Sequence, residues 1–484
     1  MPDLDWQAIL GPVLGNGVAG GISSGELEDF EQSVFRIPPR SVRLAPDCLV
    51  ELPFETLPVA WLDSGRELVD SSIRPGAYLQ HAAGCYYVQD AASMLAVALC
   101  DVQPGQQICD LCAAPGGKST ALAELLCGDG WLLANEVIHS RLGVLTAALA
   151  RTGKANYLVS NQDSQALAGA TGSLFDCVLV DAPCSGQSMV ARGKQSMASF
   201  TTDQVAHSAA RQHRIVGSAA KMVRPGGRLV YSTCTFAYEE NEAIIEPLLE
   251  SGRWQPAPIP SGLEQYASPV AAGCYRLWPH RDRCAGGFAA ALVSTGHQQA
   301  DIDTQHPRHS KWQCQDDLPE DVAEWFRSDA ALPFKSSLYN TGERLELIPS
   351  AAIDNCLGIA YSGVPIASVR HAAGARLRNA KPSGLNLKKR GKQGSPPNAA
   401  RYEPAYASAI LDDVLPARRS VELTDAQAIR FVSGEPIRDA INCDPGWCVV
   451  HWRNRPLAWG KFAGGILKNH LPKPLRQSGC IADR

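Results

Sequence analysis

The sequence predicts an α/β protein with a doubly wound, mostly parallel β-sheet, preceded by a smaller α+β domain and followed by an α+β region. Three observations support this fold class. From residue 106 onward, short apolar runs typical of strands alternate with longer runs at helical spacing. The connections between these runs are short and contain Gly, Pro, Asn and Asp, which end regular structure. The apolar fraction of 45% and charged fraction of 19% are those of a globular chain with a full core.

The strands and helices of the sheet are predicted in chain order from the apolar runs. Strands are expected at residues 107–111, 131–134, 155–160, 175–180, 228–232 and 287–293. Helices are expected at residues 121–126, 138–151, 204–223 and 239–250. The third of these helices is expected to stop at Arg224-Pro225-Gly226-Gly227, because proline and glycine end helices.

Composition divides the chain into four segments. Residues 1–92 mix short helix and strand signals, and residues 93–296 form the predicted core. Residues 297–319 are polar and lack periodicity, so we predict a linker there. Residues 320–484 form the third structured region.

The charges of the chain are unevenly distributed. The net charge is only −4, yet residues 370–476 carry 19 Lys and Arg against 8 Asp and Glu. Such an asymmetry points to a C-terminal region that faces a polyanion. Its densest part is predicted to be a loop, for which phosphate contact and simple solvation are equally open: Lys388, Lys389, Arg390 and Lys392.

The cysteines indicate the compartment in which the chain works. Sixteen cysteines in 484 residues are too sparse for the disulfide scaffold of a small secreted domain. Residues 1–16 show no secretory signal, and no apolar run approaches the length of a membrane span. We therefore expect reduced thiols, a cytoplasmic location and no membrane. Cys109 and Cys112 form a CxxC pair on a predicted strand, where they would point to opposite faces, so no metal site is expected.

Three consecutive strand ends carry groups suited to a nucleoside cofactor. The first ends in a turn of small residues that opens a helix, Cys112, Ala113, Ala114, Pro115, Gly116, Gly117 and Lys118. Glu136 ends the second strand, where an acid can accept both ribose hydroxyls, and Asp163 follows the third, where it could accept from an adenine amino group. Neither a GxGxxG turn nor a P-loop is present, so S-adenosylmethionine is the best candidate.

Two further strand-end loops each deliver a cysteine. Asp181 opens the loop that carries Cys184, and the loop of residues 232–235 carries Cys234. Ligands of open α/β sheets bind beyond the carboxyl ends of the strands, so both thiols would face one crevice. A thiol there predicts nucleophilic catalysis, and a second thiol suggests an intermediate that is both made and released.

These motifs, together with residues 239–242, resemble the Nol/Nop/Sun family of RNA cytosine-C5 methyltransferases from about residue 39 to residue 293. The resemblance implies a Rossmann-like class I methyltransferase core with an N-terminal domain that faces RNA. It places cofactor binding on residues 112–118, Glu136, Asp163 and Asp181. It makes Cys234 the nucleophile that attacks cytosine C6 and gives Cys184 a role in release. Asp181 would also bind the N3/N4 edge of the base.

The C-terminal block resembles the type F branch of bacterial 16S rRNA methyltransferases, which ends in an RNA-binding, PUA-like domain. The resemblance lies in residues 446–447, 456–461, 467–469 and 472–473. It implies ribosomal RNA as the partner, and no DNA. Gln187-Ser188 depart from the family pattern after the Cys184 loop, where an acidic or small residue and then Gly are usual. Nothing in the sequence suggests an obligate dimer, so we expect a monomer.

Three alternatives remain open at this point. Transfer RNA could replace ribosomal RNA as the substrate. A DNA cytosine-C5 methyltransferase would use Cys184, in its Pro-Cys dipeptide, as the nucleophile, but would leave the Cys234 loop unexplained. A non-catalytic RNA-binding or ribosome-assembly protein could keep the fold without turnover, although the intact cofactor turn and both cysteines argue against it.

Overall fold

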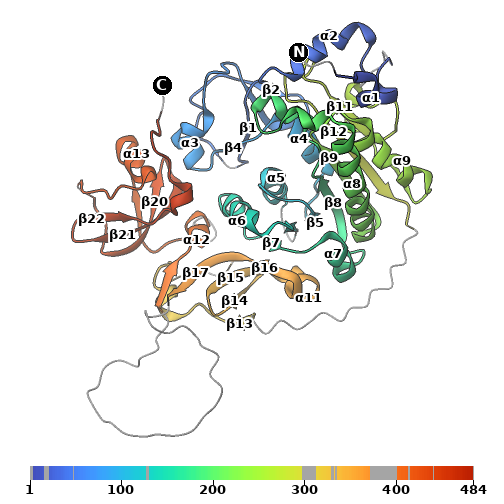
Figure 1. The fold of residues 1–484 in the computed structure, drawn as a ribbon. Helices are drawn as coiled ribbons and strands as arrows, with labels where there is room; N and C mark the ends of the chain where they lie inside the picture. The colour runs from blue at the N-terminus through green and yellow to red at the C-terminus, as the bar shows by residue number, and fades with distance from the viewer. Residues whose placement is uncertain are drawn as a thin grey trace, which may run out of the picture.

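The computed structural model describes residues 4–15, 21–46, 48–126, 130–296, 312–328, 332, 335–370, 401–411, 415–439 and 441–482. Its centre is a nine-stranded sheet in the order β10-β12-β9-β8-β5-β6-β7-β16, with β11 paired to β12 (Figure 1). Five neighbouring strands are parallel: β5 (Gln107–Asp110), β6 (Trp131–Asn135), β7 (Tyr157–Ser160), β8 (Phe175–Asp181) and β9 (Val223–Thr233). Antiparallel strands flank them: β10 (Trp254–Pro256), β11 (Cys274–Leu277), β12 (Gly287–Ser294) and β16 (Ala360–Ser362). The predicted α/β class is therefore confirmed.

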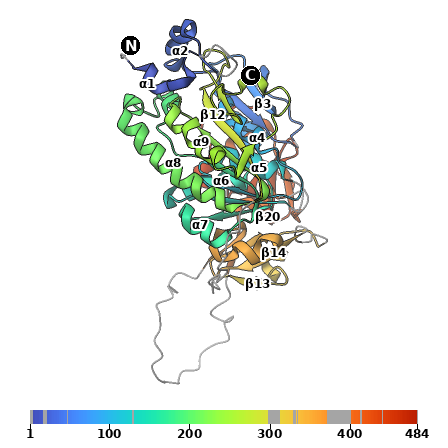
Figure 2. The ribbon, with the colours of Figure 1, turned by 90° about the vertical axis from the view of Figure 1, so that its right-hand side faces the viewer.

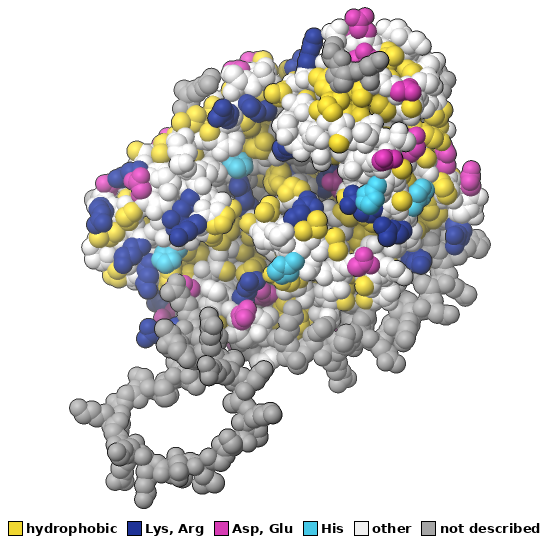
Figure 3. Space-filling view, in the orientation of Figure 1, with side chains coloured by type: hydrophobic (Ala, Val, Ile, Leu, Met, Phe, Trp, Pro, Cys, Tyr) yellow, Lys and Arg dark blue, Asp and Glu magenta, His cyan; other side chains and the backbone are white. Residues whose placement is uncertain are grey.

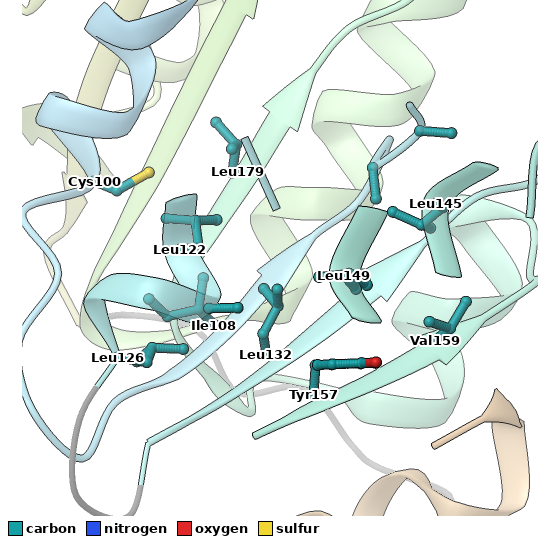
Figure 4. Close-up of a cluster of buried hydrophobic side chains, with 14 of the residues drawn as sticks. Cys100, Ile108, Leu122, Leu126, Leu132, Leu145, Leu149, Tyr157, Val159 and Leu179 are labelled. Carbon is teal, nitrogen blue, oxygen red and sulfur yellow. The ribbon is translucent and has the colours of Figure 1, made fainter. Parts of the chain in front are cut away.

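Helices cover both faces of this sheet (Figures 1 and 2). One face packs against α4 (Ala91–Cys100), α5 (Gly117–Leu125) and α6 (Leu142–Ala150), and the other against α7 (Ser164–Thr171), α8 (Thr202–Met222) and α9 (Glu242–Glu250). The face covered by α4, α5 and α6 forms the first hydrophobic core. Figure 4 shows part of it, where Leu122 and Leu149 lie near the strand residues Ile108 and Leu132. Each such side chain contributes about 1.5–3 kcal/mol when fully buried. Cys109 and Leu133, the alternate strand residues, belong to the second core.

Several boundaries differ from the prediction by a few residues, and the largest difference is at the start of β9. The segment predicted to end the long helix is included in β9, which starts at Val223, pairs with Phe175, and resumes pairing at Arg228 opposite Cys177. The intervening residues bulge out of the ladder. Glycine is required at Gly227, because a Cβ there would lie 2.9 Å from the carbonyl oxygen of Asp176. The helix α8 itself ends at Met222, close to the predicted position.

Residues before the core form two packing units. The strands β1 (Ser41–Leu44), β2 (Thr56–Val59), β3 (Leu62–Leu68) and β4 (Tyr86–Val88) form a four-stranded sheet, next to α3 (Leu79–Ala82). The helices α1 (Trp6–Leu10) and α2 (Leu27–Val34) pack instead against the loop that follows β9, where Phe30 contacts the rings of Phe236 and Trp278. The described residues among the first 34 thus support the segment that carries Cys234.

The C-terminal region contains two sheets. The first consists of β13 (Gln313–Gln315), β14 (Ser336–Asn340), β15 (Arg344–Pro349), β17 (Val364–Arg370) and β18 (Arg401–Pro404), with α10 (Glu320–Ala323), α11 (Ile353–Cys356) and α12 (Tyr406–Ile410). The second consists of β19 (Ser420–Glu422), β20 (Gly446–Trp452), β21 (Arg455–Ala463) and β22 (Ile466–Asn469), with α13 (Asp425–Ser433). Residues 313–315, predicted as linker, form β13 because they pair with β14. The rest of the predicted linker up to residue 311, and the basic loop at residues 371–400, lie outside the described residues.

Several contacts attach the C-terminal region to the rest of the molecule, including those of α11 with α7 and of α12 with α6, and two involve backbone pairing. The strand β16 extends the central sheet by pairing with β7. The last described residues pair with the N-terminal sheet region, where Leu79 donates its N–H to the carbonyl of Ile481 at 2.9 Å and Gln477 contacts His81 at 3.0 Å. The C-terminal sheet with α13 accordingly lies beside α3 in Figure 1. Among the described residues, no helix has the length and apolar character needed to cross a membrane.

Candidate active site

The structure brings the two predicted cysteines into contact. The strands β8 and β9 are parallel neighbours in which Asp181 stands opposite Ser232, so their following loops leave the sheet side by side. The Sγ atoms of Cys184 and Cys234 lie 3.3 Å apart, and the backbone N–H of Cys234 donates to Cys184 Sγ at 3.4 Å. The hydrogen bond with Cys234, followed by burial, raises the pKa of Cys184 well above its usual value. Cys184 is therefore held as a protonated thiol against the sulfur of Cys234.

A buried glutamate, Glu240, holds both cysteine loops in place. One of its carboxylate oxygens accepts the backbone N–H of Ser185 at 2.9 Å and the side-chain amide of Gln212 at 2.9 Å. The other accepts from the hydroxyl of Thr235 at 3.3 Å. Burial raises the pKa of Glu240. Glu240 lies in the motif of residues 239–242, in which three of the four residues are acidic, so no feature of the sequence distinguishes it from its neighbours.

Gln187 explains the departure from the family pattern. Its side chain is fully buried, and its amide oxygen accepts the backbone N–H of Phe236 at 2.9 Å. Its amide nitrogen donates to the carbonyl of Ser199 at 3.2 Å. Ser188 donates its backbone N–H to the carbonyl of Cys234 at 3.1 Å. The unusual residues therefore join the two cysteine loops to each other.

Lys118 connects the cofactor turn to the thiol loops. It stands in the first turn of α5, and its ammonium lies 2.7 Å from a carboxylate oxygen of Asp181. Burial works to lower the pKa of Lys118, but the charge and hydrogen bond of Asp181 outweigh it and the net shift is upward. The other oxygen of Asp181 accepts from the hydroxyl of Ser232 at 2.9 Å. Asp181 is thus oriented by one partner from each side of the site.

The turn after β5 is held close to its neighbours. Gly116 has a φ of +113°, and a Cβ there would lie 2.8 Å from Ala148 Cβ, so glycine is required. The backbone N–H of Ala113 donates to the carbonyl of Asn135 at 2.8 Å. The side chain of Asn135 donates to the carbonyls of Leu111 and Gln162 at 3.1 and 3.0 Å. This buried asparagine, to which the sequence analysis gave no role, ties three strand ends together.

Glu136 and Asp163 line the same cavity as the turn. One oxygen of Glu136 accepts the N–H of Ile138 at 2.8 Å, and the other lies 3.0 Å from Arg141. A carboxylate has about four acceptor sites, so Glu136 keeps capacity for a ligand. Asp163 caps α7 by accepting the N–H of Gln165 at 2.9 Å. Its role as a helix cap and its place on the cavity wall therefore coexist.

A cavity of about 1030 Å³ joins these groups. Its walls include all the predicted site residues except Gly116, together with residues of the β4–α4 connection and of α8. Figure 3 shows the molecule hollowed on this side, with Lys, Arg and His side chains around the hollow. The volume exceeds that of most small-ligand pockets, leaving room for a cofactor and a base. Three carboxylates, Glu136, Asp163 and Asp181, fit a ligand that carries hydroxyls and positive charge, as S-adenosylmethionine does.

Two parts of the chain match described families. Residues 97–293 match the family described as 16S rRNA methyltransferase RsmB/F, and residues 418–477 match the methyltransferase RsmF PUA domain. A ribosomal RNA small subunit methyltransferase F of Vibrio parahaemolyticus is 28% identical over 437 residues, 86% of this chain and 85% of that protein. A protein of the same name from Escherichia coli is 35% identical over 246 residues, 49% of this chain and 51% of that protein. The crystal structure of PH0851 is similar with a TM-score of 0.50 and 29% identity, covering 56% of this chain and 62% of that one.

Proposed function

We propose that this chain is a 16S rRNA methyltransferase of the RsmB/F type, which residues 97–293 match, and that it methylates C5 of a cytosine in 16S ribosomal RNA with S-adenosylmethionine as the methyl donor. The observation that carries the proposal is the contact of Cys184 with Cys234 at the edge of a cavity lined by Asp181 and Glu136. Two touching thiols above a cofactor turn suit a reaction in which one sulfur bonds to the substrate and is later released.

Bisulfite sequencing of total RNA from cells with and without this gene tests the proposal. One cytosine of 16S ribosomal RNA is expected to lose its protection in the cells without the gene. A lost site in transfer RNA instead would keep the chemistry and change the substrate. No change at any RNA cytosine would refute RNA methylation. The remaining alternatives would then be a DNA cytosine-C5 methyltransferase and a non-catalytic RNA-binding protein.

Bound S-adenosylmethionine supplies a methyl group on a positively charged sulfur. We assign its ribose hydroxyls to Glu136, its adenine amino group to Asp163, and its amino-acid part to Asp181 and to the turn of residues 112–118. Support comes from the place of these groups on successive strand ends around one cavity. The N–H groups at the start of α5 favour the carboxylate of that amino-acid part.

Replacing Glu136 with alanine is expected to weaken the binding of S-adenosylmethionine by about 10- to 100-fold, because hydrogen bonds to a charged group contribute about 1.5–3 kcal/mol. Titration calorimetry measures this loss. The matched control is Glu250→Ala, an exposed glutamate at the end of α9 that does not line the cavity. Equal affinity in both variants would remove Glu136 from the cofactor site.

The reaction that we propose begins with the Cys234 thiolate. Cytosine C5 is too weak a nucleophile by itself, and addition of sulfur at C6 makes it enamine-like. Asp181 would hydrogen-bond the N3/N4 edge of the base and stabilise the charge that develops there. Lys118 pairs with Asp181 and orients it, and the charge of Lys118 also interacts with the sulfur of Cys234. After C5 takes the methyl group, the C5 proton leaves to a base and the electron pair of the C6–S bond returns to Cys234.

Cys184 would assist that last step. Its thiol is protonated and lies 3.3 Å from the sulfur that departs. An S–H that donates to a developing thiolate stabilises it, so breaking of the C6–S bond becomes easier. Cys184 can therefore assist the release of Cys234 through contact between the two sulfur atoms, without forming a disulfide.

The face of α8 beside the cavity supports RNA as the partner. Arg211, Arg214 and Lys221 follow one another at helical spacing and all line the cavity. Arg214 and Lys221 are exposed. Positive charges in this position suit the phosphates on either side of a base that has left its stack.

Replacing both Arg214 and Lys221 with alanine is expected to weaken RNA binding at every salt concentration. The slope of log affinity against log salt should fall by about 1 for each lost phosphate contact. Filter binding at several salt concentrations measures both effects. Arg253→Ala is the control, since Arg253 is exposed but does not line the cavity. An unchanged slope in the double variant would mean that α8 does not contact phosphates.

The remaining assignments are proposals of the same kind. We propose a cytoplasmic monomer that acts on RNA and not on DNA. We also keep the predicted RNA-facing domain at residues 1–92, catalytic core at 93–296 and RNA-binding region at 320–484, whereas the linker predicted at 297–319 must end before β13 begins at Gln313. The match of residues 418–477 to the RsmF PUA domain supports the RNA-binding region.

A further inference from the structure

One buried polar group on the cavity wall has no use in the mechanism described so far. Gln89 lies between β4 and α4, and its side chain is only 6% exposed. It lines the cavity, yet neither its amide nitrogen nor its amide oxygen has a hydrogen-bond partner among the described residues. No other glutamine on the cavity wall shows this combination in the described part of the chain.

The backbone of Gln89 is firmly held, so its position is not accidental. Its N–H donates to the carbonyl of Ser41 at 3.2 Å, and its carbonyl accepts from the hydroxyl of Ser41 at 2.6 Å. Burying an amide without partners costs about 1–3 kcal/mol by mutational data. Such a cost at a rigid position needs an explanation, and a ligand in the cavity would supply the missing partners of the amide.

The surroundings of Gln89 place it between the cofactor turn and the thiol loops. A Cβ on Gly117 would lie 3.7 Å from Gln89 Cδ and 3.8 Å from Nε2, so the amide lies against the first turn of α5. The next residue along that turn is Lys118, the partner of Asp181. On the other side, the neighbouring Asp90 pairs with Arg192, which follows the Cys184 loop. The amide thus lies against the turn of residues 112–118, which lines the cavity.

The chemistry of a cytidine indicates what the amide binds there. The proposed function assigns the N3/N4 edge of the base to Asp181. The edge that remains has one acceptor, the O2 carbonyl, next to one donor, the ribose 2′-hydroxyl. A glutamine amide offers the complementary donor and acceptor. The 2′-hydroxyl is also the group by which proteins distinguish RNA from DNA.

We propose that Gln89 binds the target nucleotide through this edge, with Nε2–H donating to O2 and Oε1 accepting from the 2′-hydroxyl. The inference rests on the proposed methylation of RNA. It makes Gln89 the residue that selects ribose over deoxyribose in the substrate. Charge that develops at O2 when sulfur adds to C6 would be stabilised by the same donor.

The test combines a change in the protein with a change in the substrate. Gln89→Met keeps the size of the side chain and removes both polar atoms. The probes are an RNA fragment that contains the cytosine found by bisulfite sequencing and the same fragment with a single 2′-deoxycytidine at that position. The single-turnover rate of methylation at saturating S-adenosylmethionine is measured for each protein with each of the two RNA fragments. Wild-type protein should prefer ribose by about tenfold, the worth of one good hydrogen bond.

In Gln89→Met, the rate on RNA should fall by about tenfold and the preference for ribose should disappear. The affinity for S-adenosylmethionine should stay the same. The melting temperature should not fall, because unpartnered polar atoms are removed. Gln187→Met is the matched control: its amide is equally buried but fully bonded, so its melting temperature should drop.

Each other outcome overturns the inference. If the variant still prefers ribose, Gln89 does not read the sugar. If its affinity for S-adenosylmethionine falls as much as its rate, the amide binds the cofactor. If its melting temperature drops like that of Gln187→Met while the methylation rate is unchanged, the amide stabilises the fold and does not bind the substrate. Wild-type protein that methylates no RNA would instead refute the proposed function itself.

Discussion

Cys234→Ala is expected to abolish methylation while S-adenosylmethionine still binds with unchanged affinity. Removal of a nucleophile lowers turnover by about 10⁴-fold or more, because addition at C6 has no substitute. The residues that we propose to bind the cofactor lie on the ends of β5, β6, β7 and β8, so loss of one sulfur at the end of β9 leaves them in place. Methyl transfer from labelled cofactor and titration calorimetry measure the two quantities.

Comparing Cys234→Ala with Cys184→Ala decides which cysteine is the nucleophile. A 5-fluorocytosine substrate traps the covalent adduct, because the group at C5 cannot leave as a proton. Trapping is expected with wild type and with Cys184→Ala, but not with Cys234→Ala. Trapping that requires Cys184 and survives in Cys234→Ala would reverse the roles and favour the chemistry of a DNA-type enzyme. A tenfold loss of cofactor affinity in Cys234→Ala would contradict a role limited to attack.

Cys184→Ala is expected to accumulate a covalent complex between the protein and ordinary RNA, which contains no 5-fluorocytosine. The protonated thiol that lies 3.3 Å from Cys234 Sγ is lost, so the C6–S bond forms but breaks slowly. A slowly migrating band on a denaturing gel, dependent on S-adenosylmethionine, shows the adduct. Turnover should be lost even though the first methyl transfer takes place.

The double variant Cys184→Ala/Cys234→Ala is the control for that band. It should form no adduct, because the nucleophile is absent. Cys184→Ser tests the physical argument, since a hydroxyl also donates a hydrogen bond and should shorten the life of the adduct. Normal release by Cys184→Ala, with no band, would show that the second thiol has no part in the reaction.

Much of the site could be predicted from the sequence because its residues follow strand ends. The cofactor turn, Glu136, Asp163, and the loops of Cys184 and Cys234 each come directly after an apolar run. In a parallel sheet all carboxyl ends lie at one edge, so order along the chain suffices to bring these groups together. Each predicted strand and helix of the core has a counterpart in the structure, although several bounds differ, most of all at the start of β9, and the prediction missed α7, β10 and β11.

The positioning contacts depend on pairs that are distant in the sequence. Glu240 reaches Ser185 across 55 residues, and Gln187 reaches Phe236 across 49. No periodic pattern specifies such partners, because they form only after the sheet has brought two loops together. Gln89 is the clearest case: it reads as a polar residue before a helix, and only its burial beside Gly117 distinguishes it.

The sequence by itself determined the class of the fold, the cofactor and the two thiols, because apolar periodicity and strand-end chemistry are local. The tertiary structure alone decided that the thiols touch, that Lys118 pairs with Asp181, and that residues near Ile481 close against Leu79. These contacts depend on how whole layers pack, and packing is a property of the assembled chain that no short segment encodes.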